Sequence, residues 1–196
     1  MEEVTSYAAE KGVEIMLWVI WHALERQWDE AFEQFGKWGI KGIKMDFMNR
    51  DDQKMVQFYE AVARKAAEHK MVLNFHGAYK PSGLRRKYPN VLTREALIEF
   101  EYNGWTDYVT PEHHNILPYI RMFTGPMDYI PATMNNATKK SFRKNGDFPM
   151  GLGTRAHAMA LFVVLESPMQ MLPDSPSDYY RERECMEFIS GIPVVW

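Results

Sequence analysis

Short apolar runs alternate with longer amphipathic segments along the first half of the chain, and this alternation constrains the fold more than any other feature. Residues 13–20, 42–48 and 71–76 are mostly apolar runs of strand length. Between them, residues 24–38 and 55–66 repeat apolar side chains at helical spacing. Strands that alternate with helices in this way form βα units around a parallel sheet. The apolar character of the strands is typical of a sheet that is covered on both faces.

The pattern therefore predicts an α/β fold, and both a doubly wound sheet and a (β/α)8 barrel satisfy it. No glycine-rich phosphate loop follows any of the three strands, which disfavours a nucleotide-binding sheet. Either Asn49 or Asp51 is expected to cap the helix after the second strand, and Thr154 to cap a helix in the second half. The other expected elements are a turn or short helix from residue 93, a strand end over 107–110, helices over 116–124 and 155–165, a loop over 135–149 and a last helix opening at 175–176.

Composition excludes several classes of protein. The 23 Lys and Arg residues and 26 Asp and Glu residues leave a net charge of −3, which is not the basic footprint of a nucleic-acid-binding protein. Cys185 is the single cysteine, so no intrachain disulfide and no multi-cysteine metal site can form. The apolar stretch 156–165 falls short of the roughly 18 residues of a membrane span. Residues 1–4 lack the pattern of a signal peptide.

Polar and aromatic side chains gather in and after the predicted strands. Trp18 lies in the first strand, Lys44 and Asp46 lie at the end of the second, and Asn74 and His76 lie at the end of the third. If the sheet closes into a barrel, the carboxyl ends of its strands converge on one pocket. Aromatic platforms combined with charged and amide groups are suited to binding a sugar, so we expect an oligosaccharide or glycoside as the ligand.

The tripeptide at residues 44–46 is the most informative of these segments. Residues two apart on a strand point to the same face, so Lys44 and Asp46 are expected to project together. The nearby ammonium would favour the ionised form of Asp46. An ionised carboxylate can act as the nucleophile of a glycosidase. A structural ion pair that lines a barrel is the alternative interpretation, and the spacing leaves both open.

Glu101 is the second candidate carboxylate. It lies between bulky apolar neighbours, and partial burial would raise its pKa and suit it to general-acid chemistry. A surface glutamate at the edge of a helix is the alternative. Glu95 and Glu99 lie close by in the sequence, and carboxylate oxygens suit a hard cation such as calcium, although the spacing is not that of an EF-hand. His113 and His114 lack the spacing of a zinc site and are expected to form hydrogen bonds in a loop.

Five segments, taken together and in this order, resemble glycoside hydrolase family 97. They are Gly42 to Met48 (GIKMDFM), Asn74 to Gly83 (NFHGAYKPSG), Arg94-Glu95, Glu101-Tyr102-Asn103 and Gly125 to Tyr129 (GPMDY). The resemblance covers roughly residues 12–196. It implies a (β/α)8 catalytic barrel that lies between two β-sandwich domains. The 196 residues are fewer than the roughly 250 of a typical barrel. We therefore expect residues 1–196 to be part of an incomplete barrel, namely its middle and C-terminal βα units, without the sandwiches.

The same resemblance implies an activity and roles for particular residues. The family contains inverting α-glucosidases and retaining α-galactosidase-type members. Asp46 matches the nucleophile of the retaining members, and Gly77 occupies the position at which inverting members carry a glutamate base. Glu101 matches the general acid/base, and Glu95 matches a calcium ligand of the family.

We therefore expect a retaining glycoside hydrolase that cleaves terminal α-linked sugars, with an α-galactoside as the leading substrate. Contacts to sugar hydroxyls are expected from Lys44, His76, Trp18 and His114. An α-glucosidase of the same family and an inactive carbohydrate-binding fragment are the alternatives. Family members are typically exported to the bacterial periplasm or cell envelope, so that location is implied by the resemblance.

Overall fold

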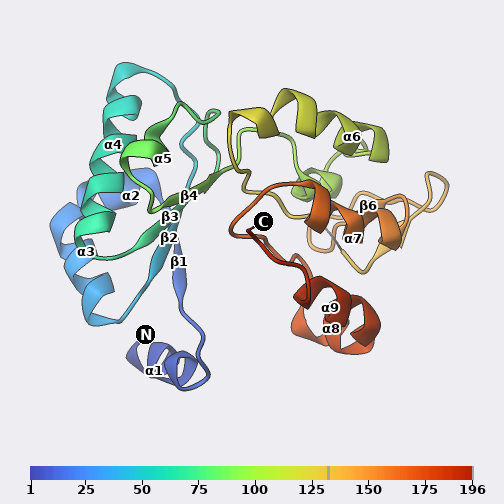
Figure 1. Ribbon diagram of the computed structural model, residues 1–196, viewed down its shortest axis with the longest axis horizontal. Helices are drawn as coiled ribbons and strands as arrows, with labels where there is room; N and C mark the ends of the chain where they lie inside the picture. The colour runs from blue at the N-terminus through green and yellow to red at the C-terminus, as the bar shows by residue number, and fades with distance from the viewer. Residues whose placement is uncertain (132, 196) are drawn as a thin grey trace. The chain divides into compact units, whose positions relative to one another are not determined.

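The computed structural model describes residues 1–131 and 133–195. The chain divides into two compact units, Met1–Ala96 and Leu97–Trp196, which we call the first and the second unit (Figure 1). The elements of the first unit are α1 (Glu2–Glu10), β1 (Met16–Ile20), α2 (Trp21–Arg26), α3 (Trp28–Lys37), β2 (Gly42–Asp46), α4 (Gln53–Glu68), β3 (Val72–Phe75), α5 (Leu84–Lys87) and β4 (Val91–Arg94).

The strands of the first unit form one parallel sheet in the order β1-β2-β3-β4. The three predicted strands and the parallel sheet are confirmed. The fourth strand, β4, was not expected, because a turn or short helix was predicted from Thr93. It forms because its backbone groups pair with β3, and because the Asn90 side chain donates to the carbonyls of Ala63 and Met71 just before it. Both contacts depend on residues distant in the sequence.

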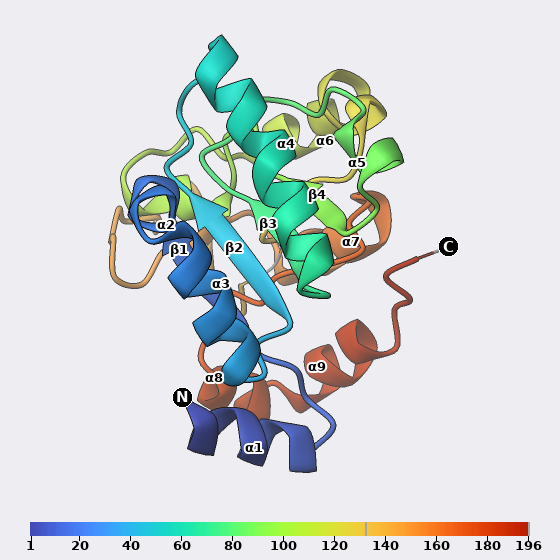
Figure 2. The ribbon, with the colours of Figure 1, turned by 90° about the vertical axis from the view of Figure 1, so that its left-hand side faces the viewer.

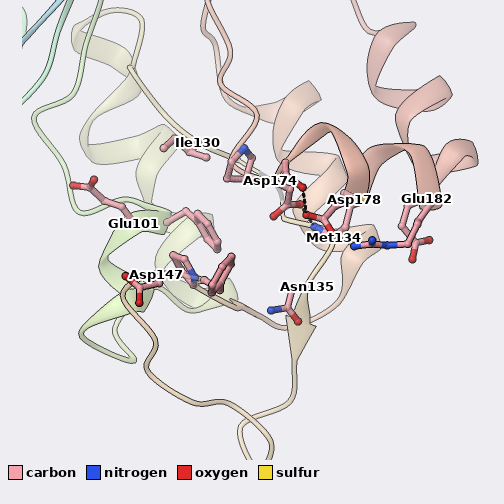
Figure 3. A pocket seen from close by; sticks show the side chains of 14 residues that line it. Glu101, Ile130, Met134, Asn135, Asp147, Asp174, Asp178 and Glu182 are labelled. Carbon is pink, nitrogen blue, oxygen red and sulfur yellow. Dashed lines mark hydrogen bonds and ion pairs between the residues drawn. The ribbon is translucent and has the colours of Figure 1, made fainter. Parts of the chain in front are cut away.

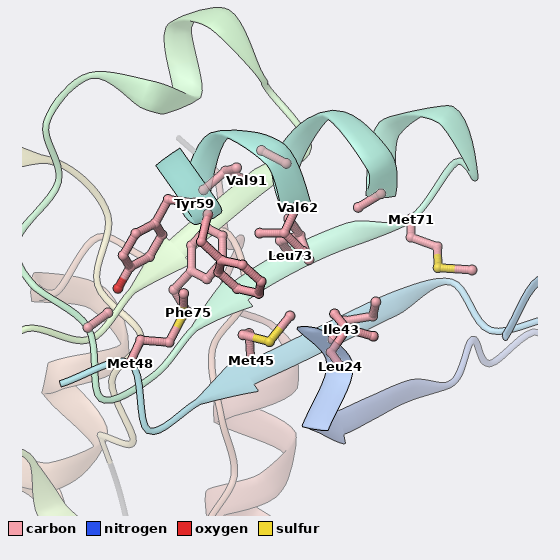
Figure 4. Close-up of a cluster of buried hydrophobic side chains, with 14 of the residues drawn as sticks. Leu24, Ile43, Met45, Met48, Tyr59, Val62, Met71, Leu73, Phe75 and Val91 are labelled. Atoms are coloured by element: carbon pink, nitrogen blue, oxygen red, sulfur yellow. The ribbon is translucent and has the colours of Figure 1, made fainter. Parts of the chain in front are cut away.

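The main apolar core lies between the sheet and the helices that cover it (Figure 4). Ile43, Met45, Leu73 and Phe75 point from β2 and β3 toward α4, where Tyr59 is among the residues that meet them. Figure 2 shows α3 and α4 lying in front of the sheet. Since strand side chains alternate between faces, the residues between these apolar positions point to the other face of the sheet.

That other face carries polar side chains. It holds Lys44 and Asp46 on β2, Asn74 on β3 and Thr93 on β4, and the last three of these are buried. In the described part of the first unit, the helices that form the core with the sheet lie on one face only. A doubly wound sheet would be apolar and helix-covered on both faces. The described sheet therefore has one apolar face covered by helices and one polar face.

Two predicted helix caps can be compared with the structure. Asp52 caps α4 by accepting the N–H groups of Lys54 and Met55, so the expectation of Asn49 or Asp51 was wrong by one residue or more. Several acidic or amide residues in succession can each satisfy the cap pattern, and the backbone path selects one of them. Thr154 accepts the N–H of His157, which confirms the cap predicted there.

The second unit contains short helices and little sheet. Its elements are η1 (Phe100–Gly104), α6 (Pro111–Ile120), η2 (Met122–Thr124), β5 (Asn136–Ala137), β6 (Gly151–Leu152), α7 (Arg155–Val164), α8 (Pro176–Arg181) and α9 (Arg183–Ser190). Two small apolar clusters hold this unit together, one of them between α7, α8 and α9. None of the described helices is long and apolar enough to cross a membrane.

Four expectations for the second unit need correction. Residues 107–110 form no strand, because Thr110 caps α6 and Pro111 begins it. That helix starts earlier than the predicted residue 116. The expected loop over 135–149 includes β5, which pairs in parallel with β6 beyond it. The predicted last helix is divided into α8 and α9 at Glu182.

Candidate active site

Asp46 ends β2, and its carboxylate is held by hydrogen bonds at both oxygens. The indole Nε1–H of Trp18 donates to Oδ2 at 2.8 Å, and the backbone N–H of Phe47 donates to Oδ1 at 2.5 Å. His76 Nδ1 lies 3.2 Å from Oδ2. Trp18 comes from the neighbouring strand β1 and His76 follows β3, so three adjacent strands supply the environment of this carboxylate.

These contacts keep Asp46 ionised. Burial works to raise the pKa of Asp46, because it removes water from the charged carboxylate. The hydrogen bonds from His76, Phe47 and Trp18 work in the opposite direction and lower that pKa to about 2. A carboxylate that stays ionised at neutral pH can act as a nucleophile or stabilise a positive charge.

His76 lies between two carboxylates of the first unit. Its Nδ1 faces Asp46, and its Nε2 lies 3.6 Å from Oε1 of Glu95. The other oxygen of Glu95, Oε2, accepts the N–H of Gly77 at 2.5 Å. All three side chains, Asp46, His76 and Glu95, are buried. The predicted site residues at the carboxyl ends of β2, β3 and β4 therefore form one cluster.

Gly77 lies in a crowded position beside Asp46. A Cβ at residue 77 would lie 3.1 Å from Asp46 Oδ1 and 3.0 Å from both the Phe47 nitrogen and Asn49 Oδ1. The backbone φ of Gly77 is +53°, in the left-handed region that favours glycine. Asp46 and a larger side chain at position 77 therefore compete for the same space.

Lys44 and Trp18 share the polar face of the sheet with Asp46. Lys44 lies two residues before Asp46 on β2, and it pairs in register with Trp18 on β1. The predicted common face of Lys44 and Asp46 is confirmed by the apolar environment of Met45 between them. Trp18 is 52% exposed, so its ring remains accessible although its Nε1–H is engaged.

Glu101 belongs to the second unit, where it lies in η1 and is partly buried. It lines a cavity of about 690 Å³ together with residues that include Phe100, Asn135, Asp147 and Asp174. Figure 3 shows Glu101 and Asp147 on one side of this cavity, and Asp174 with Asp178 and Glu182 on the other.

The acidic groups on the far side of the cavity have partners within the unit. Asp174 accepts hydrogen bonds from the Thr133 hydroxyl and the Met134 N–H, and Glu182 pairs with Arg155. Within the described residues of the second unit, the Glu101 carboxylate has no such partner. It differs in this respect from Asp174 and Glu182.

His114 has surroundings unlike those expected for a sugar contact. It is buried on α6, and its Nδ1 lies 3.0 Å from Nε2 of His157 on α7, with the two rings stacked. Burial, followed by the charges of His157 and His113, lowers the pKa of His114 to about 3, so this ring is neutral at pH 7. A sugar contact by His114 stays a prediction, and these surroundings favour a role in packing the two helices.

Glu99, which the sequence offered with Glu95 as a possible ligand of a hard cation, is fully buried, and its Oε2 accepts the N–H of Ile130 at 3.0 Å. One feature of the site was missed by sequence reasoning. Phe47 was considered only as part of a strand, although its backbone N–H binds Asp46. A bulky residue with positive φ cannot be recognised from local sequence, because no propensity favours it.

The whole chain is similar to known glycoside hydrolases. The family model described as Glycoside hydrolase 97 matches residues 1–97. A retaining alpha-galactosidase of Bacteroides thetaiotaomicron is 42% identical over 198 residues, which cover 100% of this chain and 30% of that protein. A probable retaining alpha-galactosidase of Streptomyces bingchenggensis is 30% identical over 200 residues. That match covers 99% of this chain and 29% of the relative. The chain thus spans about 30% of the length of these curated relatives.

Solved structures show the same backbone. A glycoside hydrolase family 97 enzyme from Pseudoalteromonas sp. strain K8, in complex with panose, superposes with a TM-score of 0.84 at 30% identity. The match covers 99% of this chain and 32% of that one. The same enzyme in complex with acarbose gives a TM-score of 0.82. A beta-arabinopyranosidase gives 0.83 at 27% identity, over 100% of this chain and 34% of its own.

A parallel sheet with helices on its apolar face and buried carboxylates at its strand ends defines an α/β domain with a candidate site at the carboxyl ends of its strands. The matches in sequence and in backbone structure narrow this class to one family. The chain belongs to glycoside hydrolase family 97.

Proposed function

We propose that the protein containing this chain is a retaining glycoside hydrolase that releases terminal α-linked galactose from oligosaccharides or other α-galactosides. The observation that supports this proposal most strongly is the pair of Asp46 and Gly77. Asp46 is a buried, ionised carboxylate with both oxygens oriented. Gly77 occupies the position of the glutamate base of inverting enzymes, and a Cβ there would crowd Asp46 Oδ1 at 3.1 Å. The relatives named as retaining alpha-galactosidases support the same choice.

In the proposed mechanism, Asp46 and Glu101 share two steps. Asp46 attacks the anomeric carbon and forms a C–O bond to it, while the glycosidic C–O bond breaks and Glu101 gives its proton to the leaving oxygen. Glu101 then takes a proton from water, which attacks the same carbon and releases Asp46. Each step inverts the anomeric carbon, so the product keeps the configuration of the substrate.

Three side chains of the first unit are proposed to contact the sugar. Lys44 lies on the same face as Asp46, and its ammonium can donate to a hydroxyl. His76 is in direct contact with the proposed nucleophile, and Trp18 presents a half-exposed ring beside it. In this arrangement Trp18 has two roles, since its Nε1–H orients Asp46 and its ring faces the space in front of the carboxylate.

Calcium is a further proposal, and Glu95 fits the role of a calcium ligand. Calcium takes carboxylate oxygens, and Glu95 offers a buried carboxylate that the Gly77 N–H holds in place. A bound ion would supply positive charge beside the carboxylates of the site. Titration of the full-length enzyme with calcium, followed by calorimetry, should give binding that Glu95→Gln weakens. Unchanged calcium affinity in that variant would remove Glu95 from the ligand set.

The remaining parts of the protein are proposed from the family. The four parallel strands with one polar face are suited to the wall of a (β/α)8 barrel, and flanking β-sandwich domains would complete the molecule. A bacterial periplasm or cell envelope is the proposed location.

An α-glucosidase of the same family is the second candidate function. The family 97 enzyme of Pseudoalteromonas sp. strain K8 binds panose and acarbose, and its backbone matches this chain closely. The two candidates differ in the sugar. The ratio of kcat/KM for p-nitrophenyl α-galactoside and p-nitrophenyl α-glucoside distinguishes them, and we expect the galactoside to be preferred.

The catalytic roles can be tested by chemical rescue in the full-length enzyme. Asp46→Gly should lose activity, and azide should restore it by attacking the anomeric carbon in place of the carboxylate, which gives a β-glycosyl azide. Glu101→Ala with an activated aryl substrate should instead give the α-glycosyl azide, because Asp46 still forms the covalent intermediate. Asp51→Gly, at an exposed residue nearby, is the matched control. An unimpaired Asp46→Gly enzyme would defeat the assignment.

A further inference from the structure

Three adjacent strands of the first unit end in the same way. The residue that directly follows Asp46, His76 or Glu95 has a left-handed backbone, with φ of 60° at Phe47, 53° at Gly77 and 53° at Ala96. Only one of these three is a glycine. A left-handed backbone is sterically unfavourable for a residue with a side chain, and for an aromatic residue it is a genuine outlier. Phe47 is therefore the most strained of the three positions.

The backbone of Phe47 acts directly on Asp46. The Phe47 N–H donates to Oδ1 of the preceding carboxylate at 2.5 Å, and the same residue has the left-handed backbone. In the regular continuation of β2 that N–H would point along the sheet instead. The strained conformation and the hydrogen bond to Asp46 thus occur together at one residue.

The ring of Phe47 acts on the other oxygen of Asp46 through Trp18. The two rings meet edge to face, with centroids 6.0 Å apart and planes at 85°. Trp18 in turn donates its Nε1–H to Oδ2 at 2.8 Å. One residue therefore supports both hydrogen bonds, the first through its backbone and the second through contact with the donor ring.

Burial of the ring does not account for a phenylalanine at this position. The Phe47 side chain is 53% exposed, so it gains little from the apolar core, and a glycine would adopt the same backbone without strain. Strained backbone that persists without such compensation is found at functional sites. We propose that Phe47 is a positioning residue that orients the Asp46 carboxylate, a role that rests on the proposed function of Asp46 as nucleophile.

The variant that separates this role from a structural one is Phe47→Gly in the full-length enzyme. Glycine keeps the N–H and relieves the strain, so Tm should stay at or above that of the wild type. Loss of the ring frees Trp18 and the carboxylate, so kcat for p-nitrophenyl α-galactoside should fall by about 10- to 100-fold. KM should change less than about twofold, because Lys44 and His76 keep their proposed contacts to the sugar. A merely structural residue would lower Tm and activity together.

Two controls accompany this variant. Lys70 also has a positive φ, of 54°, but it is exposed and precedes β3 at the opposite end of the strand from the site. Lys70→Gly should therefore also have a Tm at or above that of the wild type, and its kcat should be unchanged. Phe47→Asn keeps a residue that tolerates the left-handed region and also removes the ring. Phe47→Asn should reproduce the loss of kcat. It replaces Phe47→Gly as the test of the ring if Phe47→Gly does not fold.

The possible outcomes separate the inference from the proposed function. Wild-type kcat in both Phe47 variants overturns the inference and leaves the galactosidase proposal intact. If the wild-type full-length enzyme hydrolyses no α-galactoside, the proposed function fails. A crystal structure of Phe47→Gly then decides the inference alone. Displacement of the Trp18 indole from Asp46 supports it, and an unchanged Trp18–Asp46 hydrogen bond overturns it.

Discussion

At the scale of single residues, the space beside Asp46 is the most decisive property of the site. A side chain at position 77 would press on the nucleophile proposed here, because a Cβ at that position would lie 3.1 Å from Oδ1 of Asp46. A glutamate there would add a like charge to the steric conflict, and a like charge raises the pKa of a carboxylate. The retaining nucleophile Asp46 and the base that inverting members carry at position 77 would therefore compete for the same space beside Oδ1.

Gly77→Ala should reveal this competition directly. We expect kcat/KM to fall at least about 10-fold, because the methyl group displaces Asp46 or the Phe47 nitrogen from their hydrogen-bonded positions. Steady-state kinetics of the full-length enzyme provides the measurement. Gly83→Ala is the matched control. Gly83 also has a positive φ, of +88°, but no neighbouring atom would lie within 4 Å of a Cβ at that position.

Both variants carry the cost of a left-handed alanine, about 1–2 kcal/mol. Only Gly77→Ala should lose activity. Equal kcat/KM in the two variants would show that the crowding beside Asp46 has no catalytic consequence.

At the scale of elements, the helices of the second unit depend on caps and on contacts between helices. The Thr154 hydroxyl accepts the N–H of His157 at 3.1 Å and begins α7, the helix whose buried face includes Leu161 and Phe162. The side chain of His157 in turn meets His114 on α6. One cap and one histidine pair thus determine how α6 and α7 begin and meet.

Thr154→Ala should destabilise the protein by about 1 kcal/mol, the usual effect of removing an N-cap oxygen. Thr154→Ser is the control, because it keeps the oxygen and loses only a methyl group. Urea unfolding followed by circular dichroism measures both. If the two variants had the same midpoint, the cap would not contribute to stability.

The His114–His157 contact predicts a pH dependence of stability. The pKa of His114 is lowered to about 3 in the folded protein, from an ordinary value of 6.5. Between these values the unfolded state binds the proton and the folded state does not, so acid favours unfolding. Stability should be fully present above pH 6.5 and should fall as the pH decreases, by up to about 1.4 kcal/mol per pH unit.

Replacement of the ring should remove that dependence. His114→Gln should flatten the curve of unfolding free energy between pH 5 and pH 7, whereas His22→Gln, at an exposed residue, should leave it unchanged. Urea titrations at several pH values give the comparison. Parallel curves for wild type and His114→Gln would contradict the assigned pKa.

At the scale of the whole molecule, the two outer strands of the sheet matter most. Among the described strands, β1 and β4 each pair with one neighbour only. Open edges of a parallel sheet leave N–H and C=O groups that pair with other chains. A barrel removes such edges by closing the sheet on itself.

The purified 196-residue chain should therefore behave differently from the full-length enzyme. We expect it to self-associate in size-exclusion chromatography and to leave p-nitrophenyl α-galactoside intact, because its edge strands are unpaired. A galactose-dependent rise in Tm without hydrolysis would favour the carbohydrate-binding alternative. A monomer with the kcat/KM of the full-length enzyme would show that the active site is complete within these residues.

Much of the first unit could be predicted from local sequence. The three apolar strands and the helices between them follow from side-chain periods of 2 and 3.6, which need only neighbouring residues. The common face of Lys44 and Asp46 follows from the same alternation. The family resemblance added the proposed roles of Asp46, Glu95 and Glu101, which no local pattern contains.

The tertiary structure alone decided how the site is held. The Trp18–Asp46 hydrogen bond joins residues 28 apart in the sequence, and the Gly77–Glu95 bond joins residues 18 apart. The strand β4 was also missed, and the left-handed backbone of Phe47 contradicts local propensity. The sequence by itself therefore determined the three apolar strands, the helices between them and the faces that they bury. Long-range contacts decided the orientation of the carboxylate, because that orientation depends on groups that meet only after the sheet has formed.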